Sequence, residues 1–134
     1  MGSEIRIIVP MSEKKSVGTA RTLLVDWLRN EASVHLNSRV KYFSERMVIR
    51  YNQVVIKDTR SRWGSCSGKG NINFNWRIIM APEEVIDYIV IHELAHITNM
   101  DHSKSFWNVV KNYCAEYKNH QMWLRVNGEK LFFV

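Results

Sequence analysis

Two histidines and a glutamate form the pattern HExxH at residues 92–96, where the sequence reads HELAH. Successive residues of an α-helix are rotated by about 100°, so His92 and His96 project from one face, one turn apart. Two imidazoles so placed can bind one Zn²⁺, whose bonds to histidine nitrogen measure roughly 2.0–2.1 Å. Glu93 lies on the adjoining face, where it can take a proton from the water that such an ion activates. The pattern predicts a metal-dependent hydrolytic site.

A catalytic zinc site needs a third protein ligand and one position left for water. His102 follows six residues after His96 and extends the pattern to HExxHxxxxxH. The chain must turn back for this side chain to reach the ion, and Asn99 suits such a turn because Asn tolerates the left-handed conformation. Glu116, expected on the following helix, is the alternative ligand, and we favour His102. The other histidines are expected at the surface or behind the ligands: His35 and His120.

A buried cluster of His and Glu without a metal is the alternative interpretation of this pattern. Imidazole and carboxylate groups inside an apolar helix are costly unless they are paired, change their protonation or bind a metal. Apolar residues around HELAH circle most of the helix axis: Val85, Ile86, Ile89, Val90, Ile91, Leu94 and Ala95. We therefore expect this helix at the centre of the molecule and favour the metal site.

Three helices are predicted around this site. The central one begins at Pro82, whose fixed φ suits a first turn, and continues to about residue 98. Ahead of it, apolar residues recur at three- and four-residue spacing over 16–36, with Ser16 as the N-cap. After it, a helix is expected over 103–117, and residues 121–126 are expected to form a short turn.

Short β-branched or alternating segments between the first two helices predict strands at 47–51, 54–58 and 71–78. The last of these, NINFNWRI, alternates strictly between large apolar residues and Asn or Arg, as in a half-buried antiparallel strand of a hairpin. Asn75 and Arg77 are therefore expected on its polar face. The predicted fold class is α+β, with a short, mostly antiparallel sheet packed on the buried helix and flanked by further helices.

The composition fits one domain, since the chain has 134 residues of which 46% are hydrophobic. No apolar run approaches the roughly 20 residues of a membrane helix, and Glu4 and Arg6 do not fit a signal peptide. We therefore expect a cytoplasmic protein without membrane association. Two cysteines, Cys66 and Cys114, form no CxxC pair and are expected as free thiols.

Four segments that surround the HExxH pattern occur in a fixed order: RWGSC at 62–66, NINFNW at 71–76, YIVIHELAH at 88–96 and HSKSFW at 102–107. With these segments the chain resembles the YgjP-like family of zinc metallopeptidases and, more loosely, the SprT-like and WLM zincins. The resemblance implies a minimal zincin-like domain with a short sheet above the active-site helix. It also implies His92, His96 and His102 as metal ligands and Glu93 as the general base.

The edge strand of the sheet commonly binds substrate in zincins by main-chain pairing, so the resemblance implies Trp63, Gly64 and Ser65 as substrate-binding residues. Gly64 lets another backbone approach closely, although a bend in the sheet would also require a glycine. Arg60 and Arg62 are candidates to stabilise an oxyanion, although charge on a solvated strand face is the simpler interpretation.

Residues 1–15 are expected to be a flexible lead-in, and residues 16–134 a single zincin-like metallopeptidase domain. The resemblance implies a longer β-rich region ahead of the first helix, so we expect either an abbreviated relative or a trimmed catalytic portion.

The predicted function is a zinc-dependent metallopeptidase that cleaves peptide or protein substrates, with Zn²⁺ as its cofactor. A module associated with nucleic acid is one alternative, because residues 39–77 carry nine Lys or Arg against two acidic residues, a net charge of +7. Weak nucleic-acid association could also accompany peptidase activity, since SprT-like relatives act on DNA-bound protein. A metal-binding domain without turnover is the other alternative.

Overall fold

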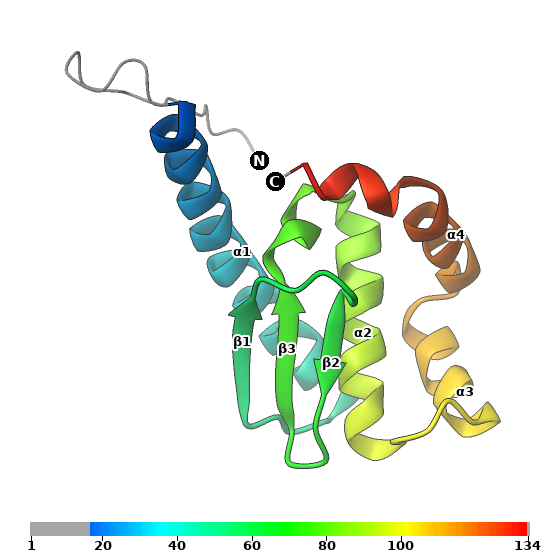
Figure 1. The fold of residues 1–134 in the computed structure, drawn as a ribbon. Coiled ribbons are helices and arrows are strands. Elements are labelled where there is room, and N and C mark those ends of the chain that lie inside the picture. Colours follow the sequence, from blue (N-terminus) through cyan, green and yellow to red (C-terminus); the bar gives the residue numbers. More distant parts are fainter. Residues whose placement is uncertain (1–16, 134) are drawn as a thin grey trace.

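The computed structural model describes residues 17–133 of the chain. The predicted lead-in at 1–15 and the predicted N-cap at Ser16 lie outside these residues. The elements follow one another in this order (Figure 1): α1 (Val17–Met47), β1 (Gln53–Lys57), β2 (Gly64–Cys66), β3 (Asn71–Asn75), the 3-10 helix η2 (Trp76–Met80), α2 (Glu83–Thr98), α3 (Lys104–Tyr113), α4 (Tyr117–Asn127) and the 3-10 helix η3 (Gly128–Leu131).

The sheet has the strand order β1-β3-β2 and mixed strand directions. β2 pairs antiparallel with β3, whereas β1 pairs parallel with it. Residues 58–63 connect β1 to β2, which lie on opposite edges of the sheet. β3 follows β2 in the sequence and lies between the two. The α+β class is confirmed, and the prediction of mostly antiparallel pairing holds for the β2–β3 hairpin only.

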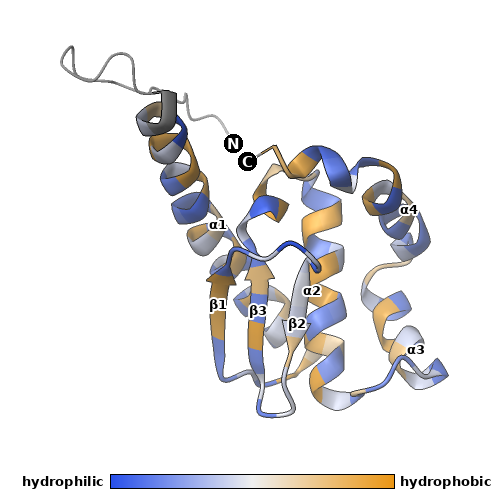
Figure 2. Ribbon diagram, viewed as in Figure 1, coloured by the Kyte–Doolittle hydropathy of each residue, from blue (hydrophilic) through white to orange (hydrophobic). Residues whose placement is uncertain are grey.

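α2 is the central helix, as predicted from its apolar residues. It contacts α1, α3, α4 and β2, and nine of its sixteen residues are buried. Figure 2 shows hydrophobic residues along β1 and β3 and on α2, where sheet and helices meet. The predicted helix over residues 82–98 agrees with α2, which spans Glu83–Thr98 with Pro82 as its N-cap.

α1 is longer than the predicted helix over 16–36, because its apolar spacing continues to the last turn. Four buried residues carry this extension: Leu36, Val40, Phe43 and Met47. The predicted strand at 47–51 is therefore wrong. Val48 turns the chain with a φ of 55°, the Ile49 N–H donates to the Ser44 carbonyl (2.9 Å), and the strand begins only at Gln53.

β3 is shorter than the predicted strand over 71–78, because the Asn75 side chain ends it. Its Oδ1 accepts a hydrogen bond from the Arg77 backbone N–H (3.1 Å), which starts the 3-10 helix η2. Asn75 and Arg77 are 1% and 0% exposed, so the prediction that they lie on a polar face is wrong.

The predicted helix over 103–117 is two helices. α3 ends at Tyr113, and α4 begins at Tyr117 and includes the segment predicted as a short turn at 121–126. Both helices contact α2. Among residues 17–133, no helix is long and apolar enough to cross a membrane.

Candidate active site

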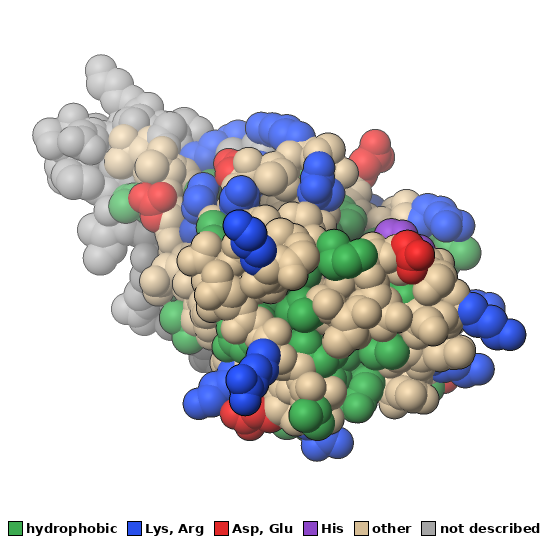
Figure 3. All heavy atoms as spheres, turned by 90° about the horizontal axis from the view of Figure 1, so that it is seen from below, with side chains coloured by type: hydrophobic (Ala, Val, Ile, Leu, Met, Phe, Trp, Pro, Cys, Tyr) green, Lys and Arg blue, Asp and Glu red, His purple; other side chains and the backbone are tan. Residues whose placement is uncertain are grey.

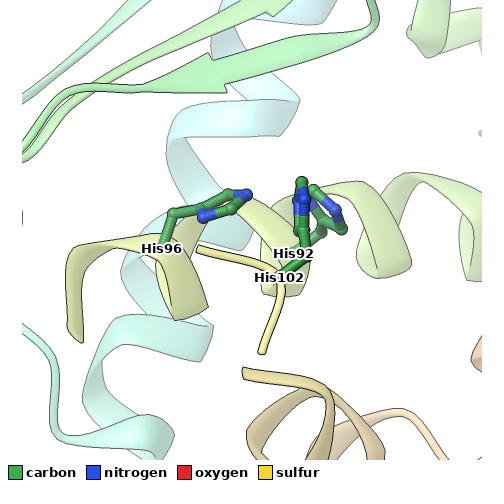
Figure 4. A group of neighbouring side chains, drawn as sticks. All are labelled: His92, His96 and His102. Atoms are coloured by element: carbon green, nitrogen blue, oxygen red, sulfur yellow. The ribbon is translucent and has the colours of Figure 1, made fainter. Parts of the chain in front are cut away.

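Three imidazoles converge in the structure, as Figure 4 shows. His92 and His96 project from one face of α2, with ring centroids 4.9 Å apart. His102 comes from the connection between α2 and α3, and its ring centroid lies 5.3 Å from that of His92 and 4.6 Å from that of His96. One ring nitrogen of each histidine lies within 4.8 Å of the other two.

The connection after α2 positions His102. The backbone N–H of Asn99 donates to the Ala95 carbonyl and ends the helix. Asn99 has a φ of −138° and a ψ of 92°, so the prediction of a left-handed turn at this residue is wrong, and the chain leaves the helix in an extended conformation. Ser103 then caps α3 by accepting a hydrogen bond from the Phe106 N–H (3.5 Å).

Phe106 supports all three histidines. Its side chain is fully buried, and its ring centroid lies 5.0 Å from those of His92 and His102 and 4.5 Å from that of His96. Phe106 lies in the first turn of α3, and His102 directly precedes the N-cap of the same helix. The start of α3 therefore positions both the Phe106 ring and the third histidine.

The Nδ1 atoms of His92 and His96 form hydrogen bonds within the chain, which leaves their Nε2 atoms available to bind a metal ion. Nδ1 of His96 lies 3.2 Å from the Asn99 carbonyl oxygen, which can only accept, so Nδ1 donates. Nδ1 of His92 lies 3.2 Å from Oε2 of Glu93. Burial is the main cause that lowers the pKa of His96, which favours the neutral imidazole that a metal ion requires.

This donor set fits a divalent cation. Imidazole nitrogen is a common zinc ligand, and three protein ligands leave one position for water or substrate. Two ligands bound tetrahedrally at about 2.0–2.1 Å lie roughly 3.4 Å apart, so small side-chain rotations would bring the three nitrogens onto one ion. Glu116, the alternative third ligand, does not belong to this cluster. It is the N-cap residue of α4, and its carboxylate accepts a hydrogen bond from the side-chain amide of Asn119 (2.6 Å).

Glu93 is buried beside the cluster, with 5% of its surface exposed. Gly64 of β2 lies directly against it, since a Cβ built on Gly64 would stand 3.1 Å from both Cγ and Oε2 of Glu93. Cys66 is a free, half-buried thiol on the same strand. Burial, with a smaller contribution from the Glu93 charge, raises its pKa to about 11, so the thiol stays protonated at neutral pH.

These groups line an open cleft of about 360 Å³ whose walls are Arg62 and β2 on one side and the three histidines on the other. His102 is exposed, whereas His92 and His96 are half-buried. The ligand cluster is therefore accessible to a substrate from solvent.

The residues that were predicted to bind substrate, Trp63 and the first two residues of β2, have different surroundings. Trp63 packs its ring against Phe132, with centroids 5.2 Å apart. The Ser65 hydroxyl accepts a hydrogen bond from Asn73 on β3 (3.1 Å), and Gly64 alone touches Glu93. β2 is an outer strand of the sheet, as an edge that pairs with substrate must be.

The remaining histidines lie outside the cluster. His35 pairs with Glu83 across the α1–α2 contact (2.8 Å). His120 faces the Tyr88 ring, with centroids 6.2 Å apart.

The basic segment at 39–77 is partly neutralised within the fold. Arg39 pairs with Asp87 (2.8 Å) and Arg77 with Asp58 (2.7 Å). Figure 3 shows Lys and Arg side chains spread around one face of the molecule, with no single basic patch there. The alternative of a nucleic-acid module finds no support in these observations.

Two features were not predicted from the sequence. One is the buried network of Asn75 and Arg77, which the alternation of NINFNWRI had assigned to solvent. The other is an apolar cavity beside Glu93 to which Leu124 of α4 contributes. The break between α3 and α4 has no clear sequence signal, so nothing indicated that this residue would reach the site.

Comparisons with known proteins bear on the fold and on the family of the chain. Two solved structures are similar in fold. The metallopeptidase zymogen of Pyrococcus abyssi abylysin is 24% identical, with a TM-score of 0.61 over 70% of this chain and 93% of that one. The metallopeptidase zymogen of Methanocaldococcus jannaschii jannalysin is 22% identical, with a TM-score of 0.59 over 70% of this chain and 95% of that one.

A search of curated proteins gives no significant match. The profile of the YgjP-like metallopeptidase domain matches residues 3–127. Because this match spans most of the sequence, the chain belongs to the YgjP-like metallopeptidase family and is a metal-dependent hydrolase.

Proposed function

We propose that the protein is a zinc-dependent peptidase in which His92, His96 and His102 hold the ion and Glu93 is the general base. The observation that carries this proposal is the convergence of three ring nitrogens within 4.8 Å, beside a buried carboxylate and at the wall of an open cleft. When bound, the ion would act as a Lewis acid on the scissile carbonyl and lower the pKa of the attacking water.

Glu93 moves the proton in this reaction. Its carboxylate accepts a proton from the attacking water and delivers it to the amine nitrogen as the C–N bond breaks. The packing against Gly64 holds the carboxylate in place, since there is no Cβ to keep it away. Nδ1 of His92 donates to Oε2 of the same carboxylate, which leaves Oε1 without this bond.

β2 is the proposed binding edge for the peptide. An extended segment can pair with the main chain of Gly64 and Cys66, because β2 has a partner on one side only. The main-chain groups of Ser65 face Asn73 of β3 in the antiparallel register. Trp63 contributes through its ring rather than its carbonyl, which already accepts a hydrogen bond from the Asn75 N–H (2.9 Å). Arg62 lies at the rim of the cleft, where its cation can face a developing oxyanion.

Glu93→Gln tests the general base. The amide cannot accept the proton, so we expect kcat for a peptide substrate to fall by about 10²- to 10⁴-fold. Metal content, measured by elemental analysis after zinc loading, is expected to stay at that of the parent.

Glu84→Gln is the matched control, because it makes the same change at an exposed position of the same helix. It is expected to retain full activity. A Glu93→Gln protein that cleaves peptides as fast as the parent would overturn the mechanism, and a parent that binds zinc but cleaves no peptide would favour a metal-binding domain without turnover.

A further inference from the structure

A second cavity lies next to the cleft, on the other side of Glu93. Its volume is about 240 Å³, and four residues border both spaces: Arg62, Gly64, His92 and Glu93. A peptide held along β2 with its scissile bond at the histidine cluster therefore passes the mouth of this cavity.

Side chains from α2 and α4 line the cavity. Tyr88 and Ile89 are 5% and 3% exposed and lie one helical turn before His92 and Glu93. Leu124 of α4 lines the cavity as well and is half-buried against the core. The same helix that carries the metal ligands thus carries apolar residues toward this cavity, at a fixed distance along its axis.

Trp63 is held in the wall by the C-terminal segment. Its ring packs on Phe132, and a Cβ on Gly128 would stand only 2.8 Å from Cζ2 of this ring. A glycine at position 128 is therefore needed for the tryptophan to lie where it does. These contacts fix the position of the tryptophan ring in the wall of the cavity.

The lining residues that the cavity does not share with the cleft carry no charge: Trp63, Tyr88, Ile89 and Leu124. The Tyr88 hydroxyl hydrogen bonds with Gln121. Arg62, His92 and Glu93 are shared with the cleft. Drug-sized ligands occupy cavities of roughly 300–1,000 Å³, so this smaller space suits a single side chain.

We infer that this cavity is a specificity pocket that takes the apolar side chain of a residue flanking the scissile bond. The inference rests on the proposed peptidase function and names its substrate class: peptides with Leu, Met or Phe at that position. A charged side chain is disfavoured because it would lose its hydration against the apolar wall of Trp63, Ile89 and Leu124.

A peptide library tests the preference. Zinc-loaded protein is incubated with peptides that are randomised on both sides of a central bond, and the products are sequenced by mass spectrometry. We expect kcat/KM for Leu, Met or Phe at one flanking position to exceed that for Gly or Asp by about tenfold or more. The Glu93→Gln protein shows which products depend on the active site.

Leu124→Lys changes the chemistry of the pocket. It is expected to lower kcat/KM for the Leu peptide by about tenfold or more and to raise that for Asp or Glu at the same position. Val126→Lys adds the same charge to the same helix at a residue that is 63% exposed, and it is expected to leave the profile unchanged. Leu124→Ala, which adds no charge, covers the case in which the lysine variant fails to fold.

A binding measurement tests the pocket without turnover. N-acetyl-leucinamide is titrated into the full chain, and the methyl NMR signals of Ile89 and Leu124 are expected to shift, whereas those of Val126 stay in place. N-acetyl-aspartamide is expected to shift none of them.

The two proposals fail in different ways. Glu93-dependent cleavage without preference for an apolar residue overturns the pocket and leaves the peptidase intact. If no Glu93-dependent cleavage occurs, the peptidase proposal fails, and equal shifts of Ile89 and Leu124 with the Leu and Asp compounds would overturn the pocket as well.

Discussion

Two groups of polar side chains are set into the apolar interior, and they differ in where their polar atoms point. Arg77, which is 0% exposed, lies at the end of β3. Its Nη1 donates to Asp58 (2.7 Å), to the Thr59 carbonyl (3.3 Å) and to Asn75 Oδ1 (3.4 Å). The guanidinium also lies over the rings of Trp76 and Phe132, at 4.6 and 4.8 Å from their centroids.

In the histidine cluster, two of the six ring nitrogens have a protein partner among the described residues. Nδ1 of His96 and of His92 have protein acceptors, while a nitrogen of each of the three rings approaches the others at the wall of a cleft. Burying polar atoms is costly unless something satisfies them. Partners supplied by the chain make the Arg77 group structural, whereas the histidine group presents ring nitrogens to an open cleft, where a partner from solution can reach them.

His102→Ala is expected to have the largest effect. Removing one of three ligands should weaken zinc binding by more than about 100-fold, since even changes behind the ligands cost 10- to 100-fold. Peptidase activity is expected to be lost with the metal, while the free energy of unfolding of the metal-free protein changes little because His102 is exposed. Competition with a zinc chelator measures the affinity.

His35→Ala is the control for that experiment, because His35 lies outside the cluster and pairs with Glu83. Its zinc affinity should equal that of the parent. Unchanged zinc binding by His102→Ala would remove this residue from the ligand set.

Arg77→Ala is expected to produce the opposite pattern. Deleting the guanidinium leaves a cavity between two rings and removes the donor to three oxygen atoms, which should lower the free energy of unfolding by about 3–5 kcal/mol. The folded fraction is expected to bind one zinc ion as before. Urea unfolding of the metal-free protein measures the change, and a loss of zinc binding in the folded protein would contradict the division between the two groups.

The same contrast explains what could be predicted from the sequence. The histidine cluster is readable because helical spacing fixes the relation of His92 to His96, and because only a short connection separates them from His102. The burial and pairing of Arg77 could not be predicted from the sequence, since its partner Asp58 lies nineteen residues earlier. Strict alternation predicted that Arg77 faces solvent, yet η2 begins one residue before it and buries it.

The helices show the same limit. The central helix was predicted because its apolar residues surround a fixed motif. The extension of α1 to Met47 follows the same spacing as its first half, so the signal was present, but the β-branched residues after Met47 favoured a strand instead. Tertiary contacts decide such cases: Ile49 is buried without strand pairing.

Gly64→Ala probes how closely the sheet holds the general base. The added Cβ would lie 3.1 Å from Glu93 Cγ, from Glu93 Oε2 and from the Asn73 carbonyl oxygen, so these groups must move by a few tenths of an ångström. Displacing a catalytic group lowers turnover steeply, and we expect kcat to fall by about tenfold with zinc content unchanged. Steady-state kinetics and elemental analysis measure the two quantities.

Gly68→Ala is the matched control, since nothing lies within 4 Å of a Cβ built there. It is expected to keep the parent kcat. Equal activity of the two alanine variants would show that β2 does not hold Glu93.

Asp58→Asn is expected to have the smallest effect on the free energy of unfolding, and this effect is expected to depend on pH. The hydrogen bond from Arg77 is the main cause that lowers the pKa of Asp58 below its ordinary value of 3.8. A carboxyl whose pKa is lower in the folded state stabilises the fold above its unfolded pKa, and this contribution is lost as the pH falls through its folded pKa. The carboxylate is 47% exposed, so the contribution should stay below about 1 kcal/mol.

The parent is therefore expected to have a higher melting temperature than Asp58→Asn at pH 6 to 7, and the difference should narrow toward pH 3. Asp26→Asn, at an exposed position of α1, is the matched control. Equal melting temperatures of the parent and Asp58→Asn at pH 6 to 7 would mean that Arg77 stabilises the fold by packing between its two rings rather than through its ion pair. In that case the Thr59 carbonyl oxygen and Asn75 Oδ1 would be the hydrogen-bond acceptors that keep the charge of Arg77 in the interior.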